Sequence, residues 1–320
     1  MTFVGHEGSW DQWRAALAGE RMHHGWILAG KRGLGKGAFA VAAARELVAE
    51  AGVVQPKGLH PDVIVLTNLP KDDKAEKLRD EGKAYEVKRN IGVDQIRMVQ
   101  HRLTTRPTLG SRRVVVIDSA DDLEKAAANA ILKSLEEPPA GTFFLLVAHR
   151  HGRLLPTIRS RCRLLPFAGL PDADMLSVLQ REAPQADGST CAAAIAAASG
   201  SPGAALEFVE LDLGNLHSVM EAIVERGDPD LALRSKLTDA MGTRPDRKRQ
   251  LAALELARAV LAGRMGRTEP AALPALAQSY ADLVRLANQA PTYNYDPGLL
   301  VMEIGGLLAS LGVPTAPAHG

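Results

Sequence analysis

A glycine-rich segment of the sequence has the G-x-x-x-x-G-K spacing of a phosphate-binding loop. It follows an apolar segment, residues 26–29, that predicts a strand, and it precedes an alanine-rich segment, residues 38–50, that predicts a helix. In that context the backbone N–H groups of the loop close around phosphate oxygens, and the helix N-terminus adds partial positive charge. The candidate phosphate-binding residues are Gly30, Gly33, Gly35, Lys36 and Gly37, with Lys36 reaching the outer phosphates.

Asp118 is the candidate acidic partner of this loop. It ends the apolar run 114–118, which predicts a parallel strand covered on both faces, and α/β proteins bind ligands at the carboxyl ends of such strands. Two groups of a hydrolytic site are missing, however. Gly37 stands where a hydroxyl would hold Mg²⁺, and Ser119 is too short and too weakly basic to polarise water. The residues favour phosphate binding without hydrolysis, and a glycine turn with no ligand is the alternative.

Ser160 and Arg161 lie in a basic segment, residues 157–162, beyond another apolar strand at 143–148. An arginine at this place cannot easily serve a phosphate held by the loop of its own chain, but it could reach one held by a neighbouring subunit. Arg159 would point to the opposite side if the segment is extended. The segment therefore predicts a chain that acts on the nucleotide of another subunit.

The elements that must position these residues alternate between strands and helices up to about residue 168, which indicates an α/β fold. After Asp118, apolar residues at helical spacing predict a helix that ends before Pro138. Asp121 and Asp122 are expected to be N-terminal charges on that helix. Its apolar face comprises Leu123, Ala127, Ala130, Ile131 and Leu135.

Several motifs occur together in an order and spacing that resembles the AAA+ subunits of bacterial sliding-clamp loaders, and specifically the delta-prime subunits of DNA polymerase III. They cover about residues 20 to 206, and the L-E-E-P-P and S-R-C signatures are far more specific than the loop alone. The motifs are the segments 30–36, 60–62, 93–97, 127–139 and 155–162.

The resemblance implies an α/β P-loop AAA+ parallel-sheet module with a small helical lid, followed by an all-α collar domain. The expected boundaries are 1–168 for the nucleotide-binding-like core, 169–208 for the lid, 209–313 for the oligomerising collar and 314–320 for a disordered tail. Many relatives also carry a four-cysteine zinc module between the loop helix and the His-Pro-Asp motif. Residues 51–59 contain no cysteine, so we expect no metal.

The same resemblance implies a role. Hydrolysing loader subunits carry Thr, Glu and Arg where this chain has Gly37, Ser119 and Gly203, whereas the Ser160-Arg161-Cys162 motif is intact. We therefore expect a subunit without intrinsic ATPase activity that presents Arg161 as an arginine finger to ATP on an adjacent subunit. The expected partners are the gamma/tau and delta subunits in a hetero-pentameric ring within the DNA polymerase III holoenzyme, and, through that ring, the sliding clamp and primed DNA.

Two other classes of function are considered. An active gamma/tau-like ATPase would have to tolerate Gly37 and use an unrecognised base. A small-molecule kinase would need an acceptor site, which the sequence does not contain, and would leave the S-R-C motif without a role. Mg²⁺-dependent ATP turnover by the purified chain separates the first alternative from the non-hydrolysing subunit. Whether ATP or ADP binds without hydrolysis stays open.

Composition agrees with this interpretation. The chain has 320 residues with 46% hydrophobic content, enough for cores in two or three domains, and a net charge of +1 that does not suggest DNA binding by bulk electrostatics. Two cysteines, Cys162 and Cys191, support neither a disulfide framework nor a metal cluster. The sequence lacks a long apolar run and a leader, which predicts a cytoplasmic protein without membrane contact.

Two charged segments remain. Residues 71–89 mix both signs, which is typical of a solvated loop or an exposed helix. A purer basic group could contact the phosphates of template DNA, a question left open here. It comprises Arg97, Arg102, Arg106, Arg112 and Arg113. His149 and His151 lack a third ligand at zinc-like spacing, so they are expected to have ordinary surface or core roles.

Overall fold

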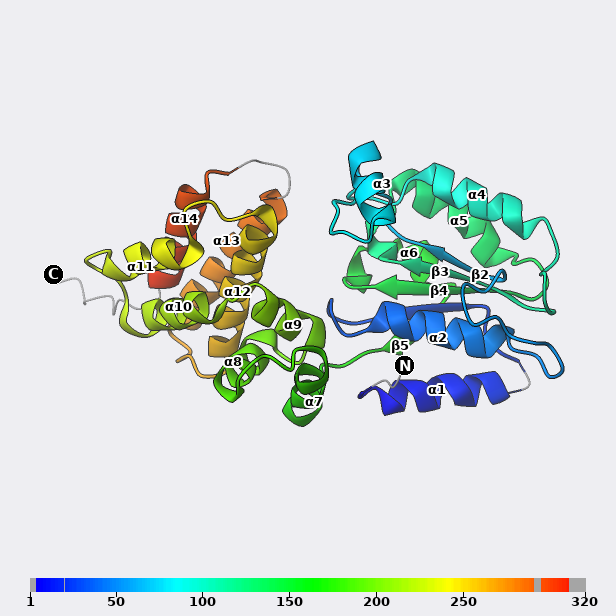
Figure 1. The fold of residues 1–320 in the computed structure, drawn as a ribbon, viewed down its shortest axis with the longest axis horizontal. Helices are drawn as coiled ribbons and strands as arrows, with labels where there is room; N and C mark the ends of the chain where they lie inside the picture. The colour runs from blue at the N-terminus through cyan, green and yellow to red at the C-terminus, as the bar shows by residue number, and fades with distance from the viewer. Residues whose placement is uncertain (1–3, 20, 291–294, 311–320) are drawn as a thin grey trace. The chain divides into compact units, whose positions relative to one another are not determined.

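The computed structural model describes residues 4–19, 21–290 and 295–310. These divide into two compact units, the first ending at Gly169 and the second beginning at Leu170. Figure 1 shows the helices and strands of both units. The predicted tail, 314–320, lies outside the described residues.

The first unit is built on a parallel sheet of five strands in the order β2-β3-β4-β1-β5. The strands predicted at 26–29, 114–118 and 143–148 are confirmed to within one residue. The bounds are Gly25–Ala29 for β1, Val63–Leu66 for β2, Arg113–Asp118 for β3, Thr142–Ala148 for β4 and Arg163–Pro166 for β5. Most side chains of β1, β3 and β4 are buried, as expected of strands covered on both faces.

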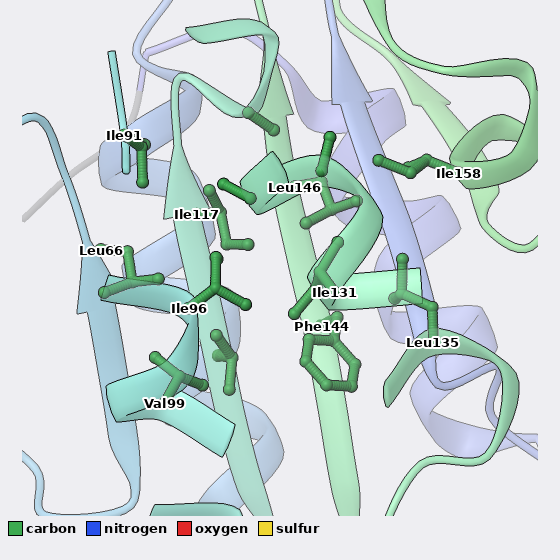
Figure 2. Close-up of a cluster of buried hydrophobic side chains, with 14 of the residues drawn as sticks. Leu66, Ile91, Ile96, Val99, Ile117, Ile131, Leu135, Phe144, Leu146 and Ile158 are labelled. Carbon is green, nitrogen blue, oxygen red and sulfur yellow. The ribbon is translucent and has the colours of Figure 1, made fainter. Parts of the chain in front are cut away.

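Helices cover both faces of this sheet (Figure 1). On one face, α4 (Val93–Leu103), α5 (Lys125–Glu136) and the single turn α6 (Pro156–Arg159) pack over an apolar cluster that Figure 2 shows, with Ile96 and Ile131 facing Ile117 and Leu146 of the strands. On the other face, α2 (Lys36–Val48) contacts β1 to β4, while α1 (Glu7–Ala18) lies beside β5.

The charged segment 71–89 contains the short helix α3, Asp73–Asp80, whose residues are exposed apart from the buried Ala75 and the half-buried Leu78. Asp72 caps this helix, because its carboxylate accepts a hydrogen bond from the Ala75 N–H. The prediction of a solvated segment is confirmed.

The second unit is helical throughout its described residues, as predicted. Its helices are α7 (Asp172–Glu182), α8 (Gly188–Ala198), α9 (Pro202–Glu210), α10 (Gly214–Arg226), α11 (Ala232–Met241), α12 (Arg247–Met265), α13 (Leu273–Gln289) and α14 (Pro297–Ala309). The predicted break at 227–229 is present, and Gly227 ends α10 with a positive φ of 71°. Because α8 contacts both α10 and α12, the predicted lid helices and collar helices pack within one unit. No helix among the described residues is both long and apolar enough to cross a bilayer.

Candidate functional site

The glycine loop joins the end of β1 to the start of α2, at the carboxyl edge of the sheet. Gly33 and Gly35 adopt φ of 79° and 77°, the left-handed region where a side chain would be strained. Gly30 is required for a different reason, since a Cβ there would lie 2.4 Å from the Phe167 carbonyl oxygen. The sequence-predicted loop is therefore formed, and each of these three glycines has a local steric cause.

Lys36 turns inward toward its own loop. Its side chain is only 2% exposed, and its Nζ donates hydrogen bonds to the carbonyl oxygens of Gly30, at 2.8 Å, and of Lys31. Burial lowers the pKa of Lys36 to about 8, although the carboxylates of Asp118 and Asp121 act in the opposite direction. The ammonium group that was expected to meet outer phosphates is held by backbone carbonyls in this structure.

Gly37, the second residue of α2, faces Asp118 at the end of β3. A Cβ at position 37 would lie 2.4 Å from Asp118 Oδ2 and 3.2 Å from its Cγ. The Asp118 carboxylate thus occupies the space that a Ser or Thr side chain at 37 would need. A side chain at position 37 would therefore require the Asp118 carboxylate to move.

Ser119 and His149 form a pair that the sequence analysis missed. Ser119 adopts a φ of 68°, and its Oγ lies 3.1 Å from His149 Nε2. Burial and the nearby Lys36 lower the pKa of His149, which favours its neutral form near pH 7. Its Nδ1 is buried and has no hydrogen-bond partner among the described residues. One signal was available: His149 directly follows a strand that pairs with β3, so both strand ends meet at one edge.

Asp121 does not act as a helix charge, and that expectation was wrong. Residues 120–122 form a 3₁₀ turn, and α5 begins only at Lys125. The buried Asp121 carboxylate accepts hydrogen bonds from the backbone N–H groups of His149, at 3.0 Å, and Arg150, at 3.1 Å. Asp121 therefore links the segment after β3 to the end of β4. Because its carboxylate is used in these hydrogen bonds, it does not cap the helix α5.

These residues surround a cavity of about 510 Å³. Its lining includes Arg32, Lys36, Gly37, Asp118, Ser119 and His149. The cavity has cationic groups and loop N–H groups for an anion. Among the described residues that line it, the carboxylate is that of Asp118, which fills the space beside Gly37. No group of three or more metal-ligating side chains occurs among the described residues.

Arg161 is not among the residues that line this cavity. It follows α6, so the segment forms a helical turn, and the extended conformation considered for Arg159 does not occur. Arg161 Nη2 forms an ion pair with Glu136 Oε1 at 2.5 Å, and Nη1 donates to the Thr157 carbonyl oxygen at 2.9 Å and to Ser160 Oγ at 3.3 Å. The side chain is 33% exposed. The guanidinium group is thus directed along the surface near α5, away from the phosphate loop of its own chain.

A match to a known protein family covers the first unit of the chain. Residues 5–171 match the model of the family described as DNA polymerase III, delta subunit. The chain belongs to this family. The resemblance to delta-prime subunits that the motifs carry is confirmed by this match and by the relatives below.

Two delta-prime subunits are similar to this chain over part of its length. The subunit of Escherichia coli is 34% identical over 62% of this chain and 58% of its own length, and that of Pseudomonas aeruginosa is 35% identical over 58% and 56%. The chain thus spans a little over half the length of these relatives. A gamma/tau subunit of Mycobacterium tuberculosis is 29% identical over 74% of this chain and 42% of its own length.

Among solved structures, a DNA polymerase III gamma subunit-related protein of Thermotoga maritima is 18% identical and aligns with a TM-score of 0.47, covering 95% of this chain and 99% of that one. The Holliday junction branch migration motor RuvB of the same organism aligns with a TM-score of 0.47 at 20% identity, over 93% of this chain and 88% of that one.

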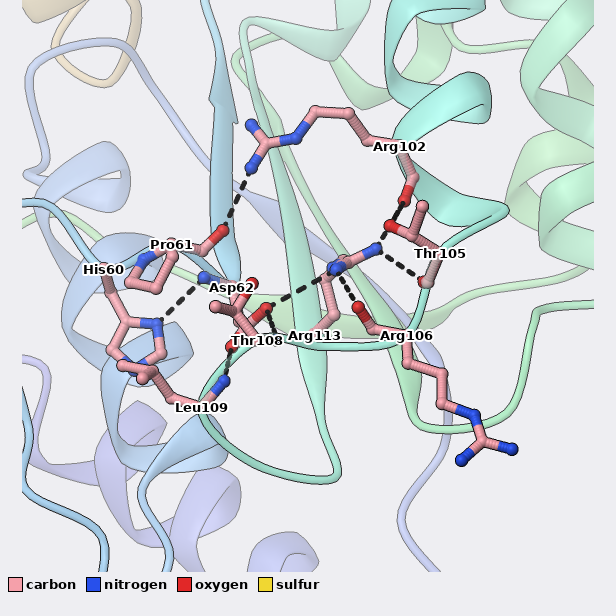
Figure 3. Close-up of polar contacts among 9 residues, drawn as sticks. All are labelled: His60, Pro61, Asp62, Arg102, Thr105, Arg106, Thr108, Leu109 and Arg113. Carbon is pink, nitrogen blue, oxygen red and sulfur yellow. Dashed lines mark hydrogen bonds and ion pairs between the residues drawn. The ribbon is translucent and has the colours of Figure 1, made fainter.

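In this delta-subunit family member, the predicted basic group does not form one surface, because Arg113 points inward to the polar contacts around Asp62 (Figure 3). Arg113 is 4% exposed and pairs with the fully buried Asp62 at 3.5 Å. It also donates hydrogen bonds to the carbonyl oxygens of Arg102, Thr105 and Arg106. Arg113 is therefore an internal anchor and cannot meet a DNA phosphate, which corrects its inclusion in the group.

The other members of the basic group have different surroundings. Arg102 donates to the Pro61 carbonyl oxygen at 3.1 Å, and Arg112 to that of Leu47 at 3.3 Å. Arg97 is exposed and pairs with Asp94 on the same helix at 3.0 Å. Arg106 is exposed as well, and Figure 3 shows its guanidinium group pointing away from the cluster.

Proposed function

We propose that this chain is a non-hydrolysing, delta-prime-type subunit of a bacterial sliding-clamp loader, and that it supplies Arg161 in trans to ATP held by a neighbouring subunit. The observation that carries the proposal is a contrast within one unit. The phosphate loop has Asp118 packed where a metal-binding hydroxyl would stand, while Arg161 is partly exposed and lies outside the cavity of that loop.

Three features support the absence of hydrolysis. Mg²⁺ would find no hydroxyl at Gly37. An attacking water would find Ser119 bound to His149, with no carboxylate at position 119. Gly203, near the start of α9, cannot act as the sensor arginine of a hydrolysing subunit. ATP or ADP held through loop N–H groups without turnover is compatible with the cavity.

The proposed partners follow from family membership. The gamma/tau and delta subunits would complete a hetero-pentameric ring in the DNA polymerase III holoenzyme, with the helices beyond about residue 208 as a collar. Contact with the sliding clamp and primed DNA would come through that ring. In the cytoplasm, such a subunit acts by completing the ATPase site of its neighbour.

An arginine finger stabilises the charge that builds on the transferring phosphoryl group and is worth roughly 10³ to 10⁵ in rate. That corresponds to about 4–7 kcal/mol of barrier. Arg161 is suited to this role because a guanidinium group presents several N–H donors in one plane. Ser160 contributes by accepting a hydrogen bond from Arg161 Nη1.

The test measures ATP turnover of a reconstituted loader with clamp and primed DNA. Arg161→Ala should leave the chain folded and able to join the ring, yet sharply reduce stimulated hydrolysis. The loss should be partial for the whole assembly, because other interfaces keep their own fingers. Arg161→Lys should rescue little, since a point charge does not reproduce a planar donor set. Arg159→Ala, two positions earlier on α6, is the control and should be milder. Unchanged turnover and clamp loading with Arg161→Ala would refute the proposal.

A further inference from the structure

Arg161 and Glu136 reach each other from two separate sequence motifs. Glu136 is the last residue of α5, and Arg161 follows the single turn α6. The residues beside them are fixed in the apolar core, because Leu135 is 1% exposed and Ile158 is fully buried. Figure 2 shows both of these side chains in the same cluster. The backbone segments that carry Glu136 and Arg161 are therefore fixed by packing in the apolar core.

The contacts of the guanidinium group leave part of it for a ligand. Arginine has five N–H donors. Two of the contacts, to the Thr157 carbonyl and to Ser160 Oγ, involve Nη1, and the third joins Nη2 to Glu136 at 2.5 Å. Among the described residues, Nε has no hydrogen-bond partner, and Nη2 has no contact besides its ion pair with Glu136. The three contacts thus fix the direction of the side chain without using all of its donors.

We propose that Glu136 is a positioning residue for the arginine finger, holding the Arg161 guanidinium group in the orientation in which its remaining donors meet the phosphates of the neighbour. This inference rests on the proposed function, because Glu136 would act only through Arg161 and would not itself contact the nucleotide. Preorganised donors cost no reorientation as charge develops in the transition state. Losing the carboxylate leaves Arg161 its charge but frees its side chain.

The size of the effect follows from the exposure of the pair. The side chains of Arg161 and Glu136 are 33% and 48% exposed. Ion pairs at such sites contribute at most about 1 kcal/mol, which is about five-fold in rate. We therefore expect Glu136→Ala to lower the kcat of the reconstituted loader by at most about five-fold, and by less than Arg161→Ala does, and to leave the KM for ATP unchanged. Glu136→Gln should recover part of this loss, because its amide oxygen keeps a polar contact of the same length within reach of Nη2 but lacks the negative charge.

Two controls make this specific. Glu137→Ala removes the same charge one residue further along, where no ion pair occurs among the described residues, and should leave turnover unchanged. A double-mutant cycle with Arg161→Ala tests whether Glu136 acts through Arg161. In the Arg161→Ala background, Glu136→Ala should cause no further loss. Ring assembly, measured by gel filtration, should be the same for every variant.

The outcomes separate this inference from the proposed function. A large loss with Arg161→Ala but none with Glu136→Ala would overturn the positioning role alone. An increase in turnover with Glu136→Ala would overturn it too, showing that the ion pair restrains the finger instead of directing it. Equal losses from Glu136→Ala with and without Arg161 would assign the residue a structural role. If Arg161→Ala itself has no effect, both the function and this inference fail.

Discussion

At the scale of single residues, Lys36 and Gly37 at the phosphate loop and Asp118 at the end of β3 form one arrangement. Lys36 is buried and donates hydrogen bonds to loop carbonyls. The nearby Asp118 carboxylate raises the pKa of Lys36, against the effect of burial. Gly37, which has no side chain, leaves space for that carboxylate. A buried charge needs partners, and here the chain supplies them itself.

Restoring the missing threonine should therefore fail. In Gly37→Thr the Cβ would lie 2.4 Å from Asp118 Oδ2, so the carboxylate must move. Overpacking of this kind typically costs about 1–3 kcal/mol of the free energy of unfolding. We expect that destabilisation in urea titrations, together with no ATP turnover above background. Ala38→Thr, at the next and exposed helical position, is the control and should cost less than about 1 kcal/mol. A burst of phosphate release from Gly37→Thr alone would contradict the assignment of Ser119 and Gly203 as limiting.

The lowered pKa of Lys36 predicts a pH dependence of stability. Lys36 titrates at about 8 in the folded chain, against an ordinary value of 10.5, so between these values the unfolded chain binds more protons. Stability contributed at this site should therefore rise with pH from about 8 to 10.5, by an upper limit of about 3 kcal/mol. Lys36→Met removes the titrating group. Its free energy of unfolding, relative to that of the wild type, should fall over this range, and a constant difference would contradict the burial of a charged lysine.

At the scale of elements, a buried ion pair organises the loop between α4 and β3. Asp62 accepts hydrogen bonds from the backbone N–H groups of Thr108 and Leu109 and faces Arg113, while Arg113 bonds to three carbonyls of the same loop. Burial alone would raise the pKa of Asp62, but these N–H groups and Arg113 lower it overall. The stability from Asp62 is thus present above pH 4 and is lost as the pH falls through its lowered pKa.

Arg113→Met should be strongly destabilising. It would leave the fully buried Asp62 carboxylate without its cation, and breaking a buried pair in this way costs about 3–5 kcal/mol. Arg97→Met removes an exposed pair on the same segment and should cost no more than about 0.5 kcal/mol. Urea denaturation of both variants measures the difference. Equal and small losses would show that Arg113 does not anchor the loop.

At the scale of the whole molecule, the chain divides after Gly169, and the predicted lid helices pack with the collar helices. The buried Phe208 of α9 and the contacts of α8 with α10 and α12 belong to the second unit. The finer division at residue 208 stays a prediction. The first unit carries its own sheet and apolar cluster, so it has the structure of an independently folding domain.

Truncation distinguishes the two boundaries. A chain ending at residue 169 should fold cooperatively, because it keeps every contact within the first unit. A chain ending at 207 cuts through α9 and exposes the faces of α7 and α8, and should be less soluble or bind a hydrophobic dye. Neither should co-purify with the other loader subunits if the collar joins the ring. Full ring affinity of the shorter chain would contradict the collar assignment.

The sequence by itself determined the strands β1, β3 and β4, the glycine loop, and the absence of a hydroxyl at position 37 and of a Glu at position 119. These follow from local composition: apolar runs form buried strands, and a missing side chain is missing in any fold. The motif order was enough to indicate the family. The helix of α5 was also predictable, although its start was misplaced because Asp121 finds stronger partners in the N–H groups of His149 and Arg150.

Only the tertiary structure decided which distant residues meet. Arg112 and Arg113 are neighbours in one basic segment, yet Arg113 enters the interior to meet Asp62 while Arg112 reaches the surface near α2. Ser119 meets His149 because β3 and β4 are adjacent in the sheet, and Glu136 meets Arg161 because α5 packs against α6. The spacing of apolar residues indicates which positions are buried. Which distant side chains meet depends on strand order and helix packing. Those are properties of the folded sheet and not of any one segment.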